Sequence, residues 1–310
     1  MVVKIENLVK RYGDLIAIDH LNLNIKQGEI FGLLGPNGSG KTTTINCMLS
    51  LLKYDKGTIE IFGQEMTPTT YNVKKDIGIV MQNVAVFDDL TVYENVDYFC
   101  GLYITNKSKR RALVEEAIDF VGLSDYKKFT PKKLSGGLLR RLNIACGIAH
   151  KPKLIILDEP TVAVDPQSRN HILEGIKKLN QEGSTIIYTS HYMEEIEQLC
   201  TSIAIMDNGK IIARGTKEEL KSMISLGEKI VVEAYNLSNT HLESIKSFPN
   251  VTDIDYKENL LTVRTKSGHS SLGEVINYVG ENKISYGKIY SELPTLNDVF
   301  LEITGKKLRD

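Results

Sequence analysis

The sequence predicts an α/β fold with a mixed, largely parallel sheet, followed by a small α+β domain. Three observations lead to this prediction: a glycine-rich loop that joins an apolar strand to a helix, three short apolar runs, and a change of pattern late in the chain. The runs lie in KLIILDE, STIIYTSH and SIAIMDNGKII, and their length suits strands that are buried on both faces. A helical pattern around MEEIEQLC separates the last two, which is typical of βαβ units.

Length and composition are those of a globular protein with room for two domains. The chain has 310 residues, of which 42% are hydrophobic and 25% charged, and its net charge of −1 gives no global attraction to nucleic acid. We expect no secretion signal, because MVVKIENLVKRY lacks an apolar core, and no apolar run approaches the ~20 residues that cross a bilayer. Four cysteines without a CxxC pair indicate buried thiols in a reducing compartment, and hence a cytosolic, soluble chain: Cys47, Cys100, Cys146 and Cys200.

The first domain is expected to span residues 1–224 and to contain three parts. Residues 2–63 show short strands broken by glycine turns, which predicts an antiparallel β subdomain with one helix after the glycine-rich loop. Residues 88–150 become helical, and TVYE at their start fits a capping box formed by Thr91 and Glu94. The remaining segments supply the parallel core.

Residues 225–310 are expected to form an accessory α+β domain. Strands are predicted at residues 228–235, 251–256, 260–265 and 284–291, and helices at residues 240–247, 270–281 and 295–304. The first six elements follow the β-α-β-β-α-β order of a ferredoxin-like unit. No paired carboxylates, histidine cluster or glycine loop marks a second active site in this segment, so we expect it to be regulatory or structural.

The segment GPNGSGKT matches the phosphate-binding pattern GxxxxGK[ST] and predicts a P-loop NTPase core. It follows the apolar strand IFGLL and opens the helix TTTINCMLSLL, the context that the motif requires, which disfavours an incidental glycine turn. Lys41 would hold the β- and γ-phosphates of ATP, and the Thr42 hydroxyl would ligate Mg²⁺. Backbone N–H groups of the loop would surround the phosphates, so the expected nucleotide-binding residues are Gly35, Pro36, Asn37, Gly38, Ser39, Gly40, Lys41, Thr42 and Thr43.

Acidic and polar residues follow three of the predicted strands. Asp158 ends the strand LIILD, where ligands gather in α/β sheets, and would hold the magnesium ion through water. Glu159 is placed to polarise a water aimed at the γ-phosphate. His191 ends the next strand and could reach the γ-phosphate, and Gln82 after IGIVM could ligate magnesium or the water. Alone, each would be an ordinary strand-end or loop residue; the phosphate loop favours a catalytic set of these residues with Lys41.

The segment LSGG at residues 134–137 is a second candidate anion site, because glycines at a helix start leave N–H groups accessible. The order of the pieces, from phosphate loop through this signature segment to the acidic pair and the strand-end histidine, resembles the ATP-binding subunit of ABC transporters over residues 2–220. In that family two ATPase domains stack head to tail, and the signature loop of one caps the nucleotide held by the other. The resemblance thus explains two anion sites in one chain.

The same resemblance implies nucleotide or interface roles for Tyr12, Ser135, Gly136, Gly137 and Asp165. Tyr12 would stack on adenine, although an exposed turn aromatic is the alternative, and Asp165 would lie at the dimer interface. Two departures from the family pattern occur. Leu138 stands where many members have Gln, so it offers the nucleotide no hydrogen bond, and VAV precedes Asp165 where a small residue followed by Leu is usual.

The tail PTLNDVFLEITGK resembles the ending of ATPases that drive bacterial ABC-2-type exporters. It also fits an amphipathic helix that packs on the small domain through Leu296, Val299, Phe300 and Ile303. The resemblance implies two kinds of partner, a second copy of the chain or a related ATPase subunit, and membrane permease subunits; no nucleic acid is expected. It also implies a cytoplasmic protein, peripheral on the inner face of the cell membrane.

The predicted function is Mg²⁺-dependent ATP hydrolysis by a head-to-tail dimer that powers export through a separate permease. One alternative is an ATP-gated clamp or scaffold that works without a membrane partner, although no basic face or coiled-coil insertion supports a nucleic-acid clamp. A P-loop kinase is the third hypothesis, and it leaves the signature segment unexplained. The cargo cannot be derived, because its specificity would lie in the membrane subunit.

Overall fold

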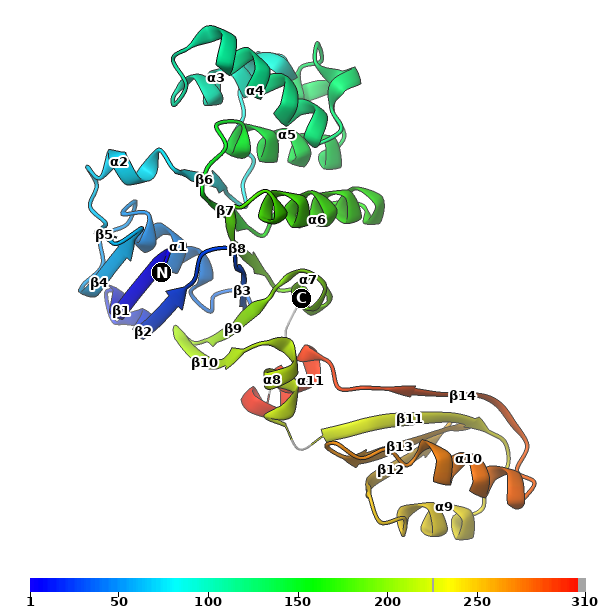
Figure 1. Cartoon of the computed structure of the whole chain (residues 1–310). Helices are drawn as coiled ribbons and strands as arrows, with labels where there is room; N and C mark the ends of the chain where they lie inside the picture. Colours follow the sequence, from blue (N-terminus) through cyan, green and yellow to red (C-terminus); the bar gives the residue numbers. More distant parts are fainter. Residues whose placement is uncertain (225, 306–310) are drawn as a thin grey trace. The chain divides into compact units, whose positions relative to one another are not determined.

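The computed structural model describes residues 1–224 and 226–305 (Figure 1). These residues form two compact units. The first spans Met1–Thr216, and the second begins at Lys217.

The first unit opens with an antiparallel sheet, as predicted for residues 2–63. Its strand order is β2-β1-β4-β5, with bounds Leu15–Ile25, Val3–Tyr12, Lys56–Ile61 and Gln64–Glu65. Along the second half of β2 the side chains of Leu21, Leu23 and Ile25 are buried and the intervening ones are exposed, because successive strand residues face opposite sides of a sheet. Ile18 is also buried, and the pairing register with β1 shifts between Ile18 and Leu21. The hairpin of β1 and β2 ends beside Tyr12, at one side of the candidate site described below.

A six-stranded mixed sheet forms the core of this unit, in the order β10-β9-β3-β8-β7-β6. Its bounds are Lys210–Gly215, Ser202–Asp207, Ile30–Leu34, Thr185–Ser190, Leu154–Asp158 and Ile77–Val80. All neighbours pair in parallel except β10, which is antiparallel to β9. Every residue of β3, β7 and β8 is buried, which explains their continuous apolar sequences.

Helices lie in the connections between the parallel strands, whose carboxyl ends meet at one edge of the sheet. They include α1 (Lys41–Met48), α6 (Pro166–Gln181) and α7 (Met193–Leu199). The parallel register places Asp158 opposite Thr189 and Leu34 opposite Ser190, so the carboxyl ends of β7, β8 and β3 lie side by side. Ligands of open α/β sheets bind at such an edge.

The predicted helical region holds α3 (Val92–Gly101), α4 (Lys107–Phe120) and α5 (Gly136–Ile148), which pack against one another. Shorter pieces are α2 (Tyr71–Lys74) before β6 and the turns η1 (Ser124–Tyr126) and η2 (Pro131–Lys133). The capping box at the start of α3 is confirmed. The Thr91 hydroxyl accepts from the Glu94 N–H at 3.3 Å, and the Glu94 carboxylate accepts from the Thr91 N–H at 2.7 Å.

The second unit contains an antiparallel sheet in the order β12-β13-β11-β14. Its elements along the chain are α8 (Lys217–Ser222), β11 (Leu226–Ala234), α9 (Asn239–Lys246), β12 (Val251–Lys257), β13 (Leu260–Lys266), α10 (Leu272–Glu281), β14 (Tyr286–Glu292) and α11 (Leu296–Thr304). The two helices α9 and α10 cover one face, so the predicted ferredoxin-like element order is confirmed (Figure 1). The core lies between sheet and helices and contains Ile230, Val232, Val263, Val275 and Val279.

The last helix packs against α8 within this unit. Leu296, Val299 and Phe300 are buried as predicted, whereas the prediction for Ile303 was wrong, because its side chain is 38% exposed. Ile303 comes one turn after Val299 at the end of α11, where Gly305 adopts a left-handed conformation and terminates the helix. The domain boundary expected after residue 224 lies inside the second unit, between α8 and β11.

Two global expectations can be compared with the described residues. Among them, no helix combines the length and the apolar character that a membrane crossing requires. The four cysteines are free and buried, as expected. Burial raises the pKa of the Cys47 and Cys100 thiols to about 11.

Candidate nucleotide-binding and hydrolysis site

The phosphate loop connects β3 to α1 and leaves no space for side chains at two of its glycines. Gly40 has a φ of 107°, and a Cβ there would lie 2.6 Å from the Ala17 carbonyl oxygen. A Cβ at Gly35 would collide with the Met206 carbonyl oxygen. Only glycine fits both positions, which keeps the loop tightly curled at the start of α1. Ser39 in the same loop is 2% exposed, and its hydroxyl has no hydrogen-bond partner, so a bound phosphate oxygen would satisfy it.

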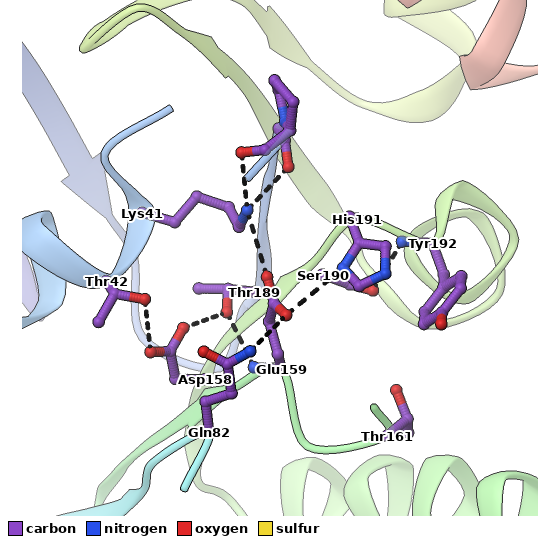
Figure 2. A network of polar contacts seen from close by, with 12 residues as sticks. Lys41, Thr42, Gln82, Asp158, Glu159, Thr161, Thr189, Ser190, His191 and Tyr192 are labelled. Carbon is purple, nitrogen blue, oxygen red and sulfur yellow. Dashed lines mark hydrogen bonds and ion pairs between the residues drawn. The ribbon is translucent and has the colours of Figure 1, made fainter. Parts of the chain in front are cut away.

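The Lys41 ammonium lies between this loop and the acidic residues. It is 5% exposed and donates hydrogen bonds to the carbonyl oxygens of Gly35, at 2.8 Å, and Pro36, at 3.1 Å. It also forms an ion pair with Glu159 Oε1 at 3.3 Å (Figure 2). A buried cation that is held by two carbonyl oxygens and one carboxylate can transfer these contacts to a phosphate chain, whose charge is higher.

Asp158 is fully buried, and each of its carboxylate oxygens accepts one hydrogen bond. The Thr42 hydroxyl donates to Oδ2 at 2.8 Å, and the Thr189 hydroxyl donates to Oδ1 at 2.6 Å. Thr42 and Asp158 therefore present paired hard oxygen atoms of the kind that Mg²⁺ prefers. No group of three or more His, Cys, Asp or Glu side chains in the described part of the chain could hold a metal ion. A Mg²⁺ ion held by Thr42 and Asp158 would take waters and phosphate oxygens as its other ligands.

Glu159 turns back toward the same site because its backbone leaves the extended conformation. Its φ is 47°, in the left-handed region, and its N–H donates to the Thr189 hydroxyl at 3.0 Å. Adjacent strand residues would otherwise point to opposite faces of the sheet. A non-glycine residue in this region is uncommon, and such conformations cluster at functional sites. The sequence alone did not reveal this turn or the role of Thr189.

Three of the predicted residues meet at the Glu159 carboxylate (Figure 2). Besides the ion pair with Lys41, Gln82 Nε2 donates to Oε2 at 3.2 Å, and His191 Nδ1 lies 3.4 Å from the same oxygen. Glu159 itself is 5% exposed. A positioned carboxylate with a histidine and an amide around it can orient and polarise a water molecule.

The backbone around Gln82 is held by Arg140, a residue that the sequence analysis missed. Arg140 lies on α5 and is 7% exposed; its guanidinium donates to the carbonyl oxygens of Met81, at 3.1 Å, and Gln82, at 2.8 Å. Burial lowers the pKa of Arg140. The helix that starts at the signature segment is thus tied directly to the residue that contacts Glu159. Nothing in the local sequence indicates this long-range pair.

A cleft of about 540 Å³ runs from the phosphate loop to the tip of the first hairpin. Of the predicted residues it is lined by Tyr12, Asn37, Gly38, Gly40, Lys41, Thr42, Thr43, Gln82 and Glu159. Tyr12 is 49% exposed and presents a ring that a purine could cover. The sequence analysis missed further lining residues: Leu15, Ile16, Ala17, Asn208 and Gly209. The Asn208-Gly209 pair was a detectable turn signal, and both residues have positive φ.

The signature segment lies outside this cleft. Ser135 and Gly136 are exposed at the start of α5, where the Ser135 hydroxyl accepts from the Leu138 N–H at 3.3 Å. Gly137 is buried, and a Cβ there would lie 2.9 Å from Asp165 Oδ2. Asp165 caps α6 by accepting from the Ser168 N–H at 2.9 Å, a bond that lowers the pKa of its carboxyl. The structure therefore brings Gly137 and Asp165 together, apart from the chain's own phosphate loop.

Two family models match this chain. Residues 18–162 match the ABC transporter family model, and residues 215–304 match the C-terminal domain of DrrA1-3-like ATP-binding proteins. The linearmycin resistance ATP-binding protein LnrL of Bacillus subtilis is 38% identical over the full length of both chains. The chain belongs to the ABC transporter ATP-binding proteins. The activity of an ABC ATPase follows from this membership, which also excludes the kinase hypothesis.

Further relatives of this ABC ATPase carry names from resistance and export. The daunorubicin resistance ATP-binding protein DrrA3 of Streptomyces coeruleorubidus is 33% identical over 99% of this chain and 97% of its own. The Nod factor export ATP-binding protein I of Burkholderia orbicola is 33% identical over 99% and 98%. Among solved structures, a dimeric ATP-binding cassette in a post-hydrolysis state with ADP and Pi has a TM-score of 0.64 and 28% identity, covering 69% of this chain and 98% of that one.

Proposed function

We propose that this ABC ATPase hydrolyses Mg·ATP as a head-to-tail dimer, with a second copy or a related subunit, and powers export through a separate membrane permease. The observation that carries the proposal is the separation of two half-sites. The cleft holds the phosphate loop and the Glu159 cluster, whereas Ser135 and Gly136 are exposed outside it. An exposed helix start that lies outside its own chain's cleft is complementary to the phosphates of a partner, because the first N–H groups of a helix attract anions.

The contacts around Glu159 support distinct roles in hydrolysis. Thr42 and Asp158 would hold Mg²⁺, with Gln82 as a further ligand, and the ion would neutralise charge on the phosphates. Lys41 would move from Glu159 to the β- and γ-phosphates, because a phosphate chain competes with one carboxylate for the ammonium. Glu159 would then be free to polarise the attacking water, and His191 would contact the γ-phosphate.

An aromatic cluster next to Gln82 supports a permease partner. Phe87 packs against Tyr98, with ring centroids 4.8 Å apart, and against Phe99 at 5.9 Å. Phe87 and Tyr98 remain 45% and 47% exposed. Exposed aromatic clusters are typical of protein interfaces. A permease segment bound here would place the protein at the inner face of the membrane. Its binding would also affect the position of Gln82, which lies five residues before Phe87 in the sequence.

The relatives named above favour export over a clamp without a membrane partner. Their names describe resistance to linearmycin and daunorubicin and export of Nod factor, and they cover nearly the whole chain. The ferredoxin-like unit, which we propose as the accessory domain, is included in this match. Export of a cargo out of the cell is therefore the proposed outcome of ATP hydrolysis.

The substitution Glu159→Gln tests the hydrolytic assignment. It should lower the hydrolysis rate about 10²- to 10⁴-fold, the usual contribution of a positioned base, while ATP affinity stays near normal. ATP should then hold the variant as a dimer that gel filtration detects. The matched control is Glu174→Gln, which replaces an exposed glutamate on α6 and should hydrolyse ATP normally. Wild-type turnover by Glu159→Gln would refute the assignment of Glu159 as the base.

A further inference from the structure

A third buried carboxylate, besides Asp158 and Glu159, lies beside the hydrolysis site without belonging to it. Glu195 on α7 is 2% exposed, and its Oε2 atom accepts hydrogen bonds from three hydroxyl groups. The donors are Thr161 at 2.9 Å, Tyr188 at 2.7 Å and Ser190 at 3.0 Å. Tyr188 and Ser190 lie on β8, and Thr161 lies in the segment that follows β7. One oxygen atom therefore joins three segments of the chain.

The other carboxylate oxygen is paired with a cation on a fourth segment. Glu195 Oε1 lies 3.3 Å from Arg169 Nε on α6. The Arg169 guanidinium also covers the Tyr192 ring, 4.8 Å from its centroid. A buried carboxylate needs such a partner, because an unpaired charge is costly to desolvate. Burial, followed by the nearby Glu195 charge, raises the pKa of Tyr188 well above its ordinary value, which keeps its hydroxyl a donor.

The same carboxylate reaches both backbone neighbours of His191. The Ser190 hydroxyl donates to Glu195. It also accepts from the Tyr192 N–H at 2.9 Å (Figure 2). The Tyr192 ring lies against the His191 ring, with centroids 4.2 Å apart. Contacts that lead to Glu195 therefore hold Ser190 and Tyr192, the two chain neighbours of His191. The Tyr192 ring in turn covers one face of the His191 ring.

We propose that Glu195 is a positioning residue that fixes His191 at the hydrolysis site. This inference rests on the proposed role of His191 at the γ-phosphate. Because Thr161 and Ser190 share one acceptor oxygen, a displacement of the segment that holds His191 would disturb the hydrogen bond to the segment that leads to Asp165. Glu195 thereby couples the residue that contacts the γ-phosphate to the segment proposed to face the partner subunit.

The test is a double-mutant cycle in the full-length chain, with Glu195→Gln, His191→Ala and the double variant. Glutamine keeps the size of the side chain but loses the charge that holds Arg169 and brings an N–H₂ group among donors. Single-turnover hydrolysis of labelled ATP resolves the slow variants, and fluorescent-nucleotide binding gives the ATP affinity. Glu194→Gln is the matched control, since it changes an exposed neighbour on the same helix.

We expect Glu195→Gln to lower the rate roughly tenfold or more, because misplacing a reacting group by about 1 Å can cost about 10²-fold. ATP affinity should not change, and Glu195→Gln should cause no further loss once His191 is alanine. Equal losses in both backgrounds, or no loss in the wild-type background, would overturn the inference.

The same experiment distinguishes a failure of the role proposed for His191 at the γ-phosphate from a failure of the inference about Glu195. If His191→Ala alone hydrolyses ATP at the wild-type rate, the proposed role of the histidine fails, and Glu195 cannot act through it. If Glu195→Gln does not fold, Ser190→Ala decides by the same cycle, since it removes only the hydroxyl between Glu195 and Tyr192. A loss with Ser190→Ala that disappears in the His191→Ala background supports the inference, and one that persists overturns it.

Discussion

At the scale of single residues, Glu159 shows how a local backbone conformation creates a site. The left-handed turn at this position directs two consecutive carboxylates, Asp158 and Glu159, to one edge of the sheet. Thr189 secures both, because its hydroxyl donates to Asp158 and accepts from the Glu159 N–H. Replacing Thr189 by an aliphatic residue would remove the group that holds the two acids in register.

The substitution Lys41→Ala should weaken ATP binding itself. It removes the buried cation of the phosphate loop, and hydrogen bonds to charged groups contribute about 1.5–3 kcal/mol, which corresponds to a loss of affinity of about 10- to 100-fold. Calorimetry with Mg²⁺ measures the affinity. Lys53→Ala, at an exposed lysine after α1, is the matched control and should bind ATP normally. Equal affinity for Lys41→Ala and wild type would show that the loop does not bind the nucleotide.

The residues of the site differ in how far the sequence revealed them. Gly35–Thr43, Asp158 and Glu159 were predictable, because each belongs to a contiguous pattern with a strand or helix beside it. Thr189 and Arg140 were not, since their partners lie 30 or more residues away in the chain. Glu195 was not either, because its role depends on contacts that gather β8, the segment after β7 and α6 around one side chain. For Glu195 the single signal was an acidic residue inside a short helix, which is ordinary on any surface.

At the scale of elements, periodicity and caps predicted most of the fold. The continuous apolar runs of β3, β7 and β8 and the capping box at Thr91 are local signals, and the structure contains all of them. The strand order of the mixed sheet is not a local property, because it depends on crossovers between distant segments. The exposure of Ile303 was not predicted for a related reason. Amphipathicity shows which side of a helix is apolar, but it does not show how far the surface that covers this side extends.

The element α8 provides a test of the domain boundary. A chain that ends at Thr216 should fold and bind ATP like the full chain, because the cleft is lined only by residues 12–209. A chain that ends at Ile224 should be less soluble, since Leu220 and Ile224 are buried in the second unit and would lose their cover. Calorimetry measures ATP binding, thermal melting measures folding, and the fraction of protein that stays in solution measures solubility. Loss of ATP binding by the shorter chain would mean that the second unit is part of the nucleotide-binding fold.

At the scale of the whole molecule, the central claim is that the signature segment serves the ATP of a partner subunit. Gly136 is the suitable position for a test. A Cβ there would have only the Ala163 carbonyl oxygen nearby, at 3.9 Å, whereas a Cβ at Gly137 would press on Ser168 and Asp165. Gly136→Asp therefore adds a carboxylate that repels phosphate without disturbing the fold.

The decisive measurement is ATP hydrolysis by mixtures of Gly136→Asp and Lys41→Ala subunits. Each variant alone should be inactive, because every site of its homodimer has one defect. In a mixed dimer that acts across the interface, one site has both defects and the other has none. The account predicts that activity returns on mixing, in proportion to the mixed dimers that form, provided that one intact site can turn over. No activity in mixtures proven to contain mixed dimers would contradict it, since a signature that served its own subunit would leave every site defective.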